Sequence, residues 1–209
     1  MSRPRRDSAV PPARERMQDA FWKLLADREY RRITVTDIVR SAQVNRNSFY
    51  YHFSGLPELA DAAILAEVQS SPLVHDAPNP DVDPQEHWRA HITHFMRTPR
   101  ERERIDRLAL LAGPHSSPEL VESLHDFARL SLIGTLELDS DHLDLKTDLL
   151  LDFTAGGLLS ILKRWPELRE TISMDDLLND DVAMLAMGIY MSMSKENMLA
   201  YWNRIFNKG

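Results

Sequence analysis

The chain contains no cysteine among its 209 residues. This absence excludes a disulfide framework and thiol-based metal or redox sites, and it fits a reducing cytoplasm. Long apolar runs are also missing: the longest uncharged stretch of the C-terminal region, residues 182–194, has 13 residues. A membrane span needs ~18. Residues 1–6 have no apolar segment behind their arginines, so they do not form a signal peptide pattern. We therefore expect a soluble, cytoplasmic protein.

Enzyme signatures are lacking too. The sequence has no Gly-x-Ser-x-Gly, no phosphate-binding glycine loop and no His-Glu-x-x-His, so an enzyme would have to be assembled from scattered residues. Alternating strand patterns are absent as well, whereas helical spacing of apolar residues recurs along the chain. The sequence predicts an all-α protein that is not an enzyme.

The charge is unevenly distributed. The net charge of −7 by itself argues weakly against binding to nucleic acid. Residues 1–60, however, hold 11 Lys and Arg against 7 Asp and Glu, whereas residues 61–209 hold 14 against 25. This division is typical of a DNA-reading end joined to a body that does not contact DNA.

Residues 33–53, ITVTDIVRSAQVNRNSFYYHF, predict two short helices joined by a tight turn. The first helix begins at Thr34, whose hydroxyl can accept a hydrogen bond from the backbone N–H of Asp37. Its apolar face consists of Val35, Ile38, Val39 and Ala42. Because these side chains recur at helical spacing, we expect this helix to be packed against a core.

Gln43 and Val44 form the predicted turn, and Asn45 can cap the second helix. Phe49 and Phe53, at positions i and i+4, are expected to join Val44 in the core. The remaining faces carry Asn45, Arg46, Asn47, Ser48, Tyr50, Tyr51 and His52. Arginine can pair with guanine and asparagine with adenine, while Ser, Tyr and His can bind phosphate oxygens. An αα-hairpin with a merely polar surface is the alternative.

The Thr-initiated helix, the turn and the ending FYYHF at residues 49–53 resemble the N-terminal domain of the TetR family of bacterial transcriptional repressors. The resemblance covers roughly residues 14–66 and implies a helix-turn-helix DNA reader. Arg46, Asn47 and Tyr50 are then expected to carry recognition. The full set of predicted DNA-binding residues is Thr34, Thr36, Asn45, Arg46, Asn47, Ser48, Tyr50, Tyr51 and His52.

Two positions depart from the family pattern. The family usually has Gly in the turn where this chain has Gln43, so we expect a non-glycine residue in a left-handed or neighbouring conformation. The family often has Lys at the start of the next helix, where this chain has Leu56. One phosphate contact is then missing, which affects non-specific affinity more than specificity.

Three segments follow from the pattern: a flexible basic arm at residues 1–11, a DNA-binding domain with its linking helix at residues 12–69, and a helical ligand-binding and dimerisation domain at residues 70–209. In the first domain, long helices are predicted at residues 12–27 and 57–69. The second of these is expected to bury Leu59, Ala60, Ala63, Ile64 and Ala66. Body helices are predicted at residues 84–97, 99–111 and 117–136, with capping residues at Asp83, Thr98 and Ser117.

The segment 143–165 is apolar on most sides, and Pro166 is expected to end it. Such a helix needs partners on two sides, and a second subunit can supply one of them. A further apolar run, residues 182–193, follows the capping pair Ser173 and Asp176. The predicted dimer interface comprises Leu150, Phe153, Gly157, Ile161, Met184, Met187 and Met191. Two core helices of a monomer are the alternative.

The family resemblance also implies a ligand cavity in the body, for which we select Trp88, His91, Phe95 and Phe127. His87, His91 and His94 share one face of a predicted helix, and such pairs can chelate zinc or nickel. No acid on that face completes the set, so we expect neither a metal nor a cofactor.

These observations predict a homodimeric, ligand-responsive repressor that binds a palindromic double-stranded operator. The competing interpretation is a module of the same fold that binds another protein and does not read DNA.

Overall fold

The computed structural model describes residues 11–70, 90, 93–94, 97–136, 138–171, 173 and 176. These residues form helices and their connections, and no strand occurs among them. The elements are α1 (Ala13–Asp27), the 3-10 helix η1 (Tyr30–Arg32), α2 (Val35–Ser41), α3 (Arg46–His52), α4 (Leu56–Gln69), α7 (Pro99–Leu110), α8 (Pro118–Thr135) and α9 (Leu145–Thr171). The all-α prediction is confirmed.

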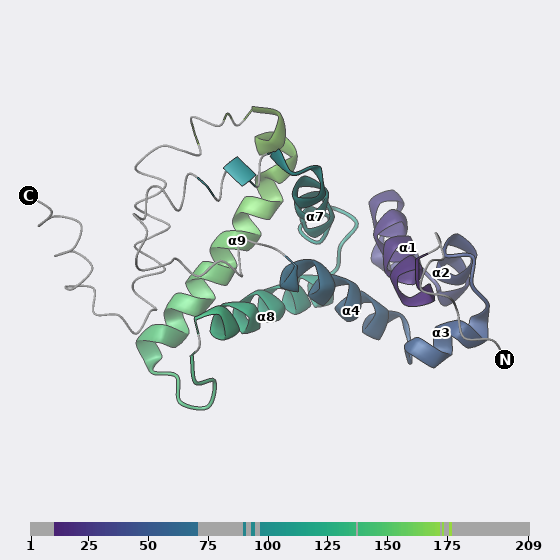
Figure 1. Ribbon diagram of the computed structural model, residues 1–209, viewed down its shortest axis with the longest axis horizontal. Coiled ribbons are helices and arrows are strands. Elements are labelled where there is room, and N and C mark those ends of the chain that lie inside the picture. Colours follow the sequence, from purple (N-terminus) through teal and green to yellow (C-terminus); the bar gives the residue numbers. More distant parts are fainter. Residues whose placement is uncertain are drawn as a thin grey trace, which may run out of the picture.

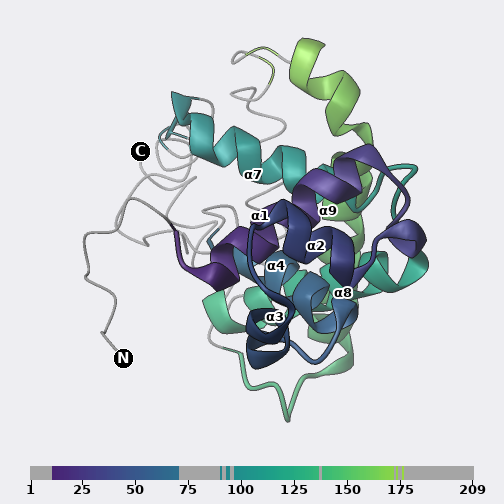
Figure 2. The ribbon, with the colours of Figure 1, turned by 90° about the vertical axis from the view of Figure 1, so that its right-hand side faces the viewer.

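Helices α1, α2 and α3 gather at one end of the molecule (Figure 1), and they face the viewer in Figure 2. Met17, Phe21 and Leu25 recur every fourth residue along α1 and are fully buried. They share one core with Ile38 of α2 and Phe49 of α3. Since α2 and α3 have only seven residues each, they depend on this core rather than on their own helix propensity.

Helix α4 runs from this end toward α8 (Figure 1). Leu59, Ala60, Ala63 and Ile64 are buried as predicted. The expectation for Ala66 is wrong: Ala66 is exposed, and its neighbour Glu67 is buried instead. Glu67 tolerates burial because arginines of α7 pair with its carboxylate, a compensation that apolar periodicity does not indicate.

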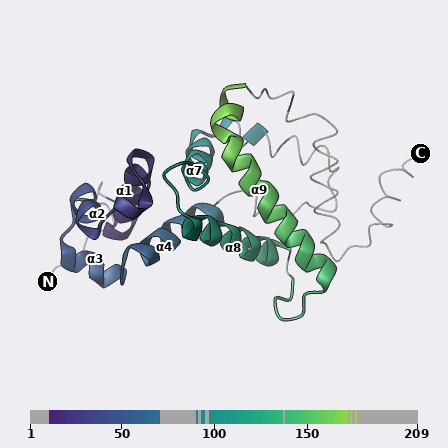
Figure 3. The same cartoon turned by 180° about the vertical axis from the view of Figure 1, so that it is seen from behind.

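The body consists of α7, α8 and α9 as far as the described residues go. Helix α8 packs against α4 and α9, and α7 packs against α9, an arrangement that is seen from behind in Figure 3. The predicted helices at residues 99–111 and 117–136 are confirmed to within two residues. Thr98 precedes α7 as expected, but its hydroxyl donates to the His94 carbonyl (2.8 Å) and makes no capping bond to α7.

Pro166 does not end the apolar helix, contrary to our expectation: α9 continues through it to Thr171. A proline removes one backbone donor, so continuation requires tertiary support. That support comes from α7, where the Asp106 carboxylate accepts from Trp165 Nε1 (2.8 Å) and from Arg169 Nη1 (3.1 Å). These contacts hold the helix on both sides of the proline.

Ser173 and Asp176 form the predicted capping pair: the Asp176 N–H donates to Ser173 Oγ (3.1 Å), and the Ser173 N–H donates to the Asp176 carboxylate (2.9 Å). The apolar run 182–193 and most of the predicted helix 84–97 lie outside the described residues. None of the described helices is long and apolar enough to cross a membrane.

Candidate nucleic-acid interface

The start of α2 is fixed by a reciprocal cap. Thr34 Oγ1 accepts from the Asp37 N–H (3.2 Å), and the Asp37 carboxylate accepts from the Thr34 N–H (3.1 Å) and from the Thr34 hydroxyl (2.6 Å). The predicted capping bond is confirmed. These bonds, first from the side chain and then from the backbone of Thr34, lower the pKa of Asp37. The folded pKa lies below the unfolded value, so the cap stabilises α2 above that value and is lost as the pH falls through the folded pKa.

Gln43, in the turn between α2 and α3, has a positive φ of 52°. No other non-glycine residue of the described part of the chain has a positive φ. The left-handed conformation expected at this position is confirmed. Arg16 of α1 reaches across to this turn, where its Nη1 donates to the Ala42 carbonyl (3.0 Å) and the Gln43 carbonyl (3.3 Å). These two bonds satisfy carbonyls that the end of α2 leaves without helical partners.

The sequence did not indicate the role of Arg16. The contact joins residues 26 positions apart, and α1 carries several other polar residues at helical spacing that look equivalent. Only the folded arrangement of α1 against the turn selects Arg16.

Helix α3 has two distinct faces. Asn45 Oδ1 accepts from the Ser48 N–H (2.7 Å), which caps the helix as predicted. Phe49 and Phe53 point into the core, where they are 0% and 1% exposed. This burial fixes the rotation of α3, so that its opposite side chains face solvent in a defined direction.

The solvent face of α3 carries Arg46, Asn47, Tyr50 and Tyr51, all exposed. Tyr51 is 84% exposed and Tyr50 is 50% exposed, and both rank among the exposed large hydrophobic residues. The Arg46 guanidinium lies over the Tyr50 ring, 5.7 Å from its centroid, with Nη2 3.4 Å from the Tyr50 hydroxyl. Each side chain therefore restricts the rotamers of the other before any ligand arrives.

The remaining predicted DNA-binding residues lie around this face. Thr34, Thr36 and Asn45 are exposed, and Ser48 and His52 are half-buried. Leu56, in the position where a lysine was expected, packs against the core. Arg14 is exposed and lies over the Phe53 ring at 5.7 Å, which puts a cation beside the end of α3 that the sequence did not single out.

The candidate ligand and metal residues are only partly described. Trp88, His91, Phe95 and His87 lie outside the described residues. Phe127 is half-buried and lines a hollow between α4 and α8 together with Leu65 and Leu130. His94 is exposed. Among the residues with described placement, no cluster of His, Asp or Glu could hold a metal ion.

Helix α9 is buried on one face only, through Leu151, Ala155, Leu162 and Trp165. A stripe on the other face, which we call the α9 stripe, consists of Leu145, Leu149, Phe153, Gly157 and Ile161, spaced four residues apart and all exposed. Of the predicted interface residues, Phe153, Gly157 and Ile161 belong to this stripe, and Leu150 is half-buried beside it. Met184, Met187 and Met191 lie outside the described residues.

A short capped helix, a tight turn and a second helix with an exposed polar face together form a helix-turn-helix motif, the arrangement found in many DNA-binding proteins. Residues 19–63 match the family model of the bacterial regulatory proteins of the tetR family. The match covers the N-terminal part of the chain, from the middle of α1 to the middle of α4.

Individual proteins are also similar to this chain. The uncharacterized HTH-type transcriptional regulator YxbF of Bacillus subtilis is 34% identical over 77 residues, which cover 35% of this chain and 20% of that protein. The solved structure of the fatty acid degradation regulator FadR from Bacillus halodurans is similar with a TM-score of 0.52 at 18% identity, over 87% of this chain and 97% of that one. At this identity the likeness to FadR concerns the fold alone.

A second solved structure, a TetR transcriptional regulator from a Rhodococcus species, has a TM-score of 0.47 at 14% identity over 84% of this chain and 95% of that one.

Proposed function

We propose that this protein is a transcriptional regulator, a ligand-responsive repressor that acts in the cytoplasm as a homodimer on a palindromic operator. The observation that carries this proposal is the solvent face of α3, on which Arg46, Asn47 and Tyr50 are exposed opposite a fully buried Phe49. A helix of this kind fits the major groove of DNA, where side chains reach base edges.

The exposed residue types suggest separate roles. The Arg46 fork suits the O6 and N7 atoms of guanine, and the Asn47 amide suits adenine. Tyr50 holds Arg46 by stacking and presents its ring to the same groove. Thr36, Tyr51 and His52 are assigned mainly to phosphates, which set the register of α3 in the groove.

Dimerisation is proposed because of the α9 stripe. Three of its members, Leu149, Phe153 and Ile161, are 58%, 65% and 53% exposed. An apolar stripe more than four helical turns long is costly in water and is covered when two copies meet. Gly156 and Gly157 fit this arrangement because the space beside them is open to another helix. Nothing lies within 4 Å of a Cβ built at either glycine. A two-fold dimer matches a two-fold operator.

The effector is proposed to bind in the body, near Phe127. A ligand changes DNA binding only through its different affinity for two conformations of the protein. In this proposal, the ligand-bound conformation holds the two α3 helices at a separation that does not fit successive major grooves. The proposal assigns the chain no catalytic step.

Selection of DNA fragments from a genomic pool by the purified protein tests the proposal. We expect enrichment of one inverted repeat whose affinity falls steeply as salt rises, because phosphate contacts release counterions. The double variant Arg46→Ala/Tyr50→Ala serves as the control and should lose the enrichment while remaining folded. If folded, dimeric protein enriches no sequence, the DNA-reading proposal is wrong and a protein-binding module takes its place.

A further inference from the structure

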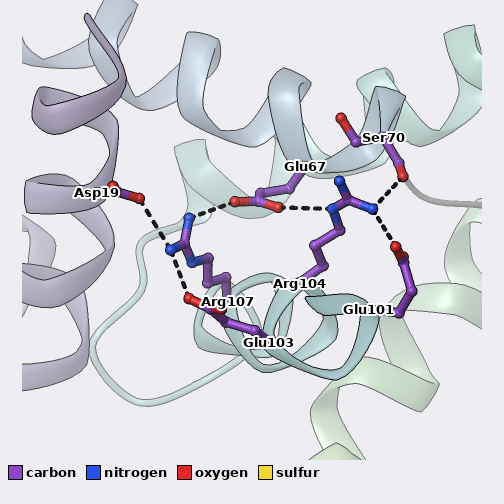
Figure 4. A network of polar contacts seen from close by, with 7 residues as sticks. All are labelled: Asp19, Glu67, Ser70, Glu101, Glu103, Arg104 and Arg107. Carbon is purple, nitrogen blue, oxygen red and sulfur yellow. Dashed lines mark hydrogen bonds and ion pairs between the residues drawn. The ribbon is translucent and has the colours of Figure 1, made fainter. Parts of the chain in front are cut away.

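A network of charged residues joins the DNA-reading end to the body (Figure 4). We call it the junction network; it consists of Asp19 of α1, Glu67 and Ser70 at the end of α4, and Glu101, Glu103, Arg104 and Arg107 of α7. Neither the helix-turn-helix motif nor the α9 stripe uses these residues. They lie where α1, α4 and α7 meet.

Arg107 connects all three helices through one guanidinium. Its Nη1 donates to the Glu67 carboxylate (2.7 Å), and its Nη2 pairs with Asp19 (3.0 Å) and Glu103 (2.8 Å). The guanidinium is planar and its donors point in fixed directions, so it holds two carboxylates at a defined separation. Asp19 and Glu67 belong to different helices, and Arg107 therefore fixes α1 and α4 relative to α7.

Arg104 holds the end of α4 in the same way. Its Nη1 donates to the backbone carbonyl of Ser70 (2.7 Å) and to the Glu101 carboxylate, and its Nε lies 3.7 Å from Glu67. A cation at the C-terminal end of a helix satisfies a free carbonyl and opposes the helix dipole. Glu67 thus receives one arginine from each side, as Figure 4 shows.

The central residues of this network are more buried than those of an ordinary surface ion pair. The side chain of Glu67 is 12% exposed and that of Arg107 is 25% exposed. Burial by itself lowers the pKa of Arg107, but the bond to Glu67 and the charges of Glu67 and Asp19 raise it overall, so the arginine remains charged. A carboxylate as buried as Glu67 strongly disfavours any orientation of the helices in which it loses its arginines.

A second contact between the two parts lies near the C-terminal end of α1. The Tyr30 N–H donates to the His115 carbonyl (2.8 Å), and His115 Nδ1 lies 3.1 Å from the Leu25 carbonyl. This contact lies away from Arg107, so the two contacts together resist rotation of α1 against the body.

We propose that Arg107 is a positioning residue that fixes the orientation of the α1–α3 unit relative to the body. Arg107 touches no DNA in this proposal; it acts through Asp19 and Glu67. The consequence for DNA rests on the proposed function. In the proposed homodimer, the same orientation sets the separation of the two α3 helices, and this separation determines the operator spacing that is bound.

The orientation can be measured without DNA. The chain has no cysteine, so Ser41→Cys in the DNA-reading end and Glu122→Cys in α8, both at exposed positions, accept one spin label each. Labelled protein is diluted with an excess of unlabelled protein, so that pulsed electron paramagnetic resonance records distances within one chain. The full chain should give one narrow distance distribution.

Two variants break the junction network and one matched variant does not. Arg107→Ala and the milder Asp19→Asn should broaden the distribution or displace its maximum. Arg129→Ala should leave it unchanged, because Arg129 has similar exposure (22%) and also pairs with two carboxylates, Asp148 and Asp152, but joins α8 to α9 within the body. If Arg107→Ala and Asp19→Asn both keep the narrow distribution, the positioning role is wrong. Asp19 is partly exposed, so its variant keeps the test valid if Arg107→Ala does not fold.

The DNA step uses the unlabelled variants on a single half-site and on inverted repeats whose spacers differ by one base pair. For the original chain, a wrong spacer should weaken binding by about 10-fold to 100-fold. Asp19→Asn and Arg107→Ala should bind the half-site unchanged and lose most of this spacer preference. A purely stabilising network would instead leave the spacer preference intact. If the protein prefers no DNA sequence, only the proposed function is contradicted. The distance measurement still shows whether Arg107 fixes the orientation of the α1–α3 unit.

Discussion

The α1–α3 unit and helix α9 differ in what they expose. In the α1–α3 unit the aromatic residues at the centre, such as Phe21 and Phe49, are fully buried, and the outer face of α3 is mostly polar. In α9 the buried face is narrow, and side chains as large as Phe153 are exposed on the other side.

This contrast teaches what each region needs. The α1–α3 unit has a covered core and presents hydrogen-bonding groups, so its partner must be polar, as a DNA groove is. The α9 stripe presents almost no hydrogen-bonding side-chain groups, so it suits an apolar partner, such as the second copy of the stripe in the proposed dimer. In the proposed function, the two surfaces therefore divide DNA reading and dimerisation between them.

Removal of the central aromatic residue of α3 is expected to have the largest effect, because it destabilises the covered core of the α1–α3 unit. Phe49→Ala deletes a side chain that is 0% exposed, and such a change costs about 3–5 kcal/mol. Urea unfolding followed by circular dichroism measures it. The control Tyr51→Ala removes an aromatic that is 84% exposed and should change stability by less than about 0.5 kcal/mol. Equal effects of the two variants would contradict the assigned rotation of α3.

A charge in the α9 stripe should weaken dimerisation, the role proposed for that surface. Phe153→Asp replaces an exposed apolar side chain that we expect to be buried twice, once from each copy, in the dimer. The dimer dissociation constant should rise by more than about 100-fold, with little loss of monomer stability. Sedimentation over a range of concentrations measures this. Ala26→Asp, which adds the same charge at an exposed position of α1, should leave dimerisation unchanged.

Changes on the polar face of α3 should act on DNA and not on the fold. Arg46→Ala is expected to weaken binding to the selected operator by about 1–3 kcal/mol and to relax preference at one base pair. Tyr50→Phe keeps the ring under Arg46 but removes the hydroxyl 3.4 Å away, so its effect should be smaller. Fluorescence anisotropy titrations measure both, and unchanged affinity of Arg46→Ala would remove Arg46 from the recognition face.

The smallest expected effect concerns the turn. Gln43→Gly relieves a φ of 52° but adds freedom to the unfolded chain, so a net stabilisation of less than about 1 kcal/mol should result. The unfolding midpoint measures it, with Gln69→Gly near the end of α4 as a helical control that should destabilise. Destabilisation by Gln43→Gly would mean that the Gln43 side chain makes a contact that stabilises the turn.

Local features were the ones that the sequence predicted well. The cap at Thr34, the cap at Asn45 and the burial of Phe49 depend on residues within four positions of one another, and all three are confirmed. The left-handed Gln43 was predicted from the resemblance, because most family members have glycine there.

Features that depend on distant partners were missed or wrong. Arg16 meets the turn 26 positions away, and Glu67 is buried because of Arg107, 40 positions away. Pro166 was expected to end α9, but Asp106 of α7 holds the residues on both sides of it. A periodic pattern reports which face of a helix is apolar, and it does not report which charged side chains a second helix will neutralise.

The division between the two surfaces is tested most directly by one comparison of complexes on DNA. The original chain and Phe153→Asp are each titrated onto the selected inverted repeat and onto its half-site, and the mass of each complex is measured in solution. We expect two chains of the original protein on the repeat. We also expect both proteins to bind the half-site with equal affinity, and Phe153→Asp alone to bind the repeat much more weakly. Binding of Phe153→Asp to the repeat as two chains with undiminished affinity would contradict it.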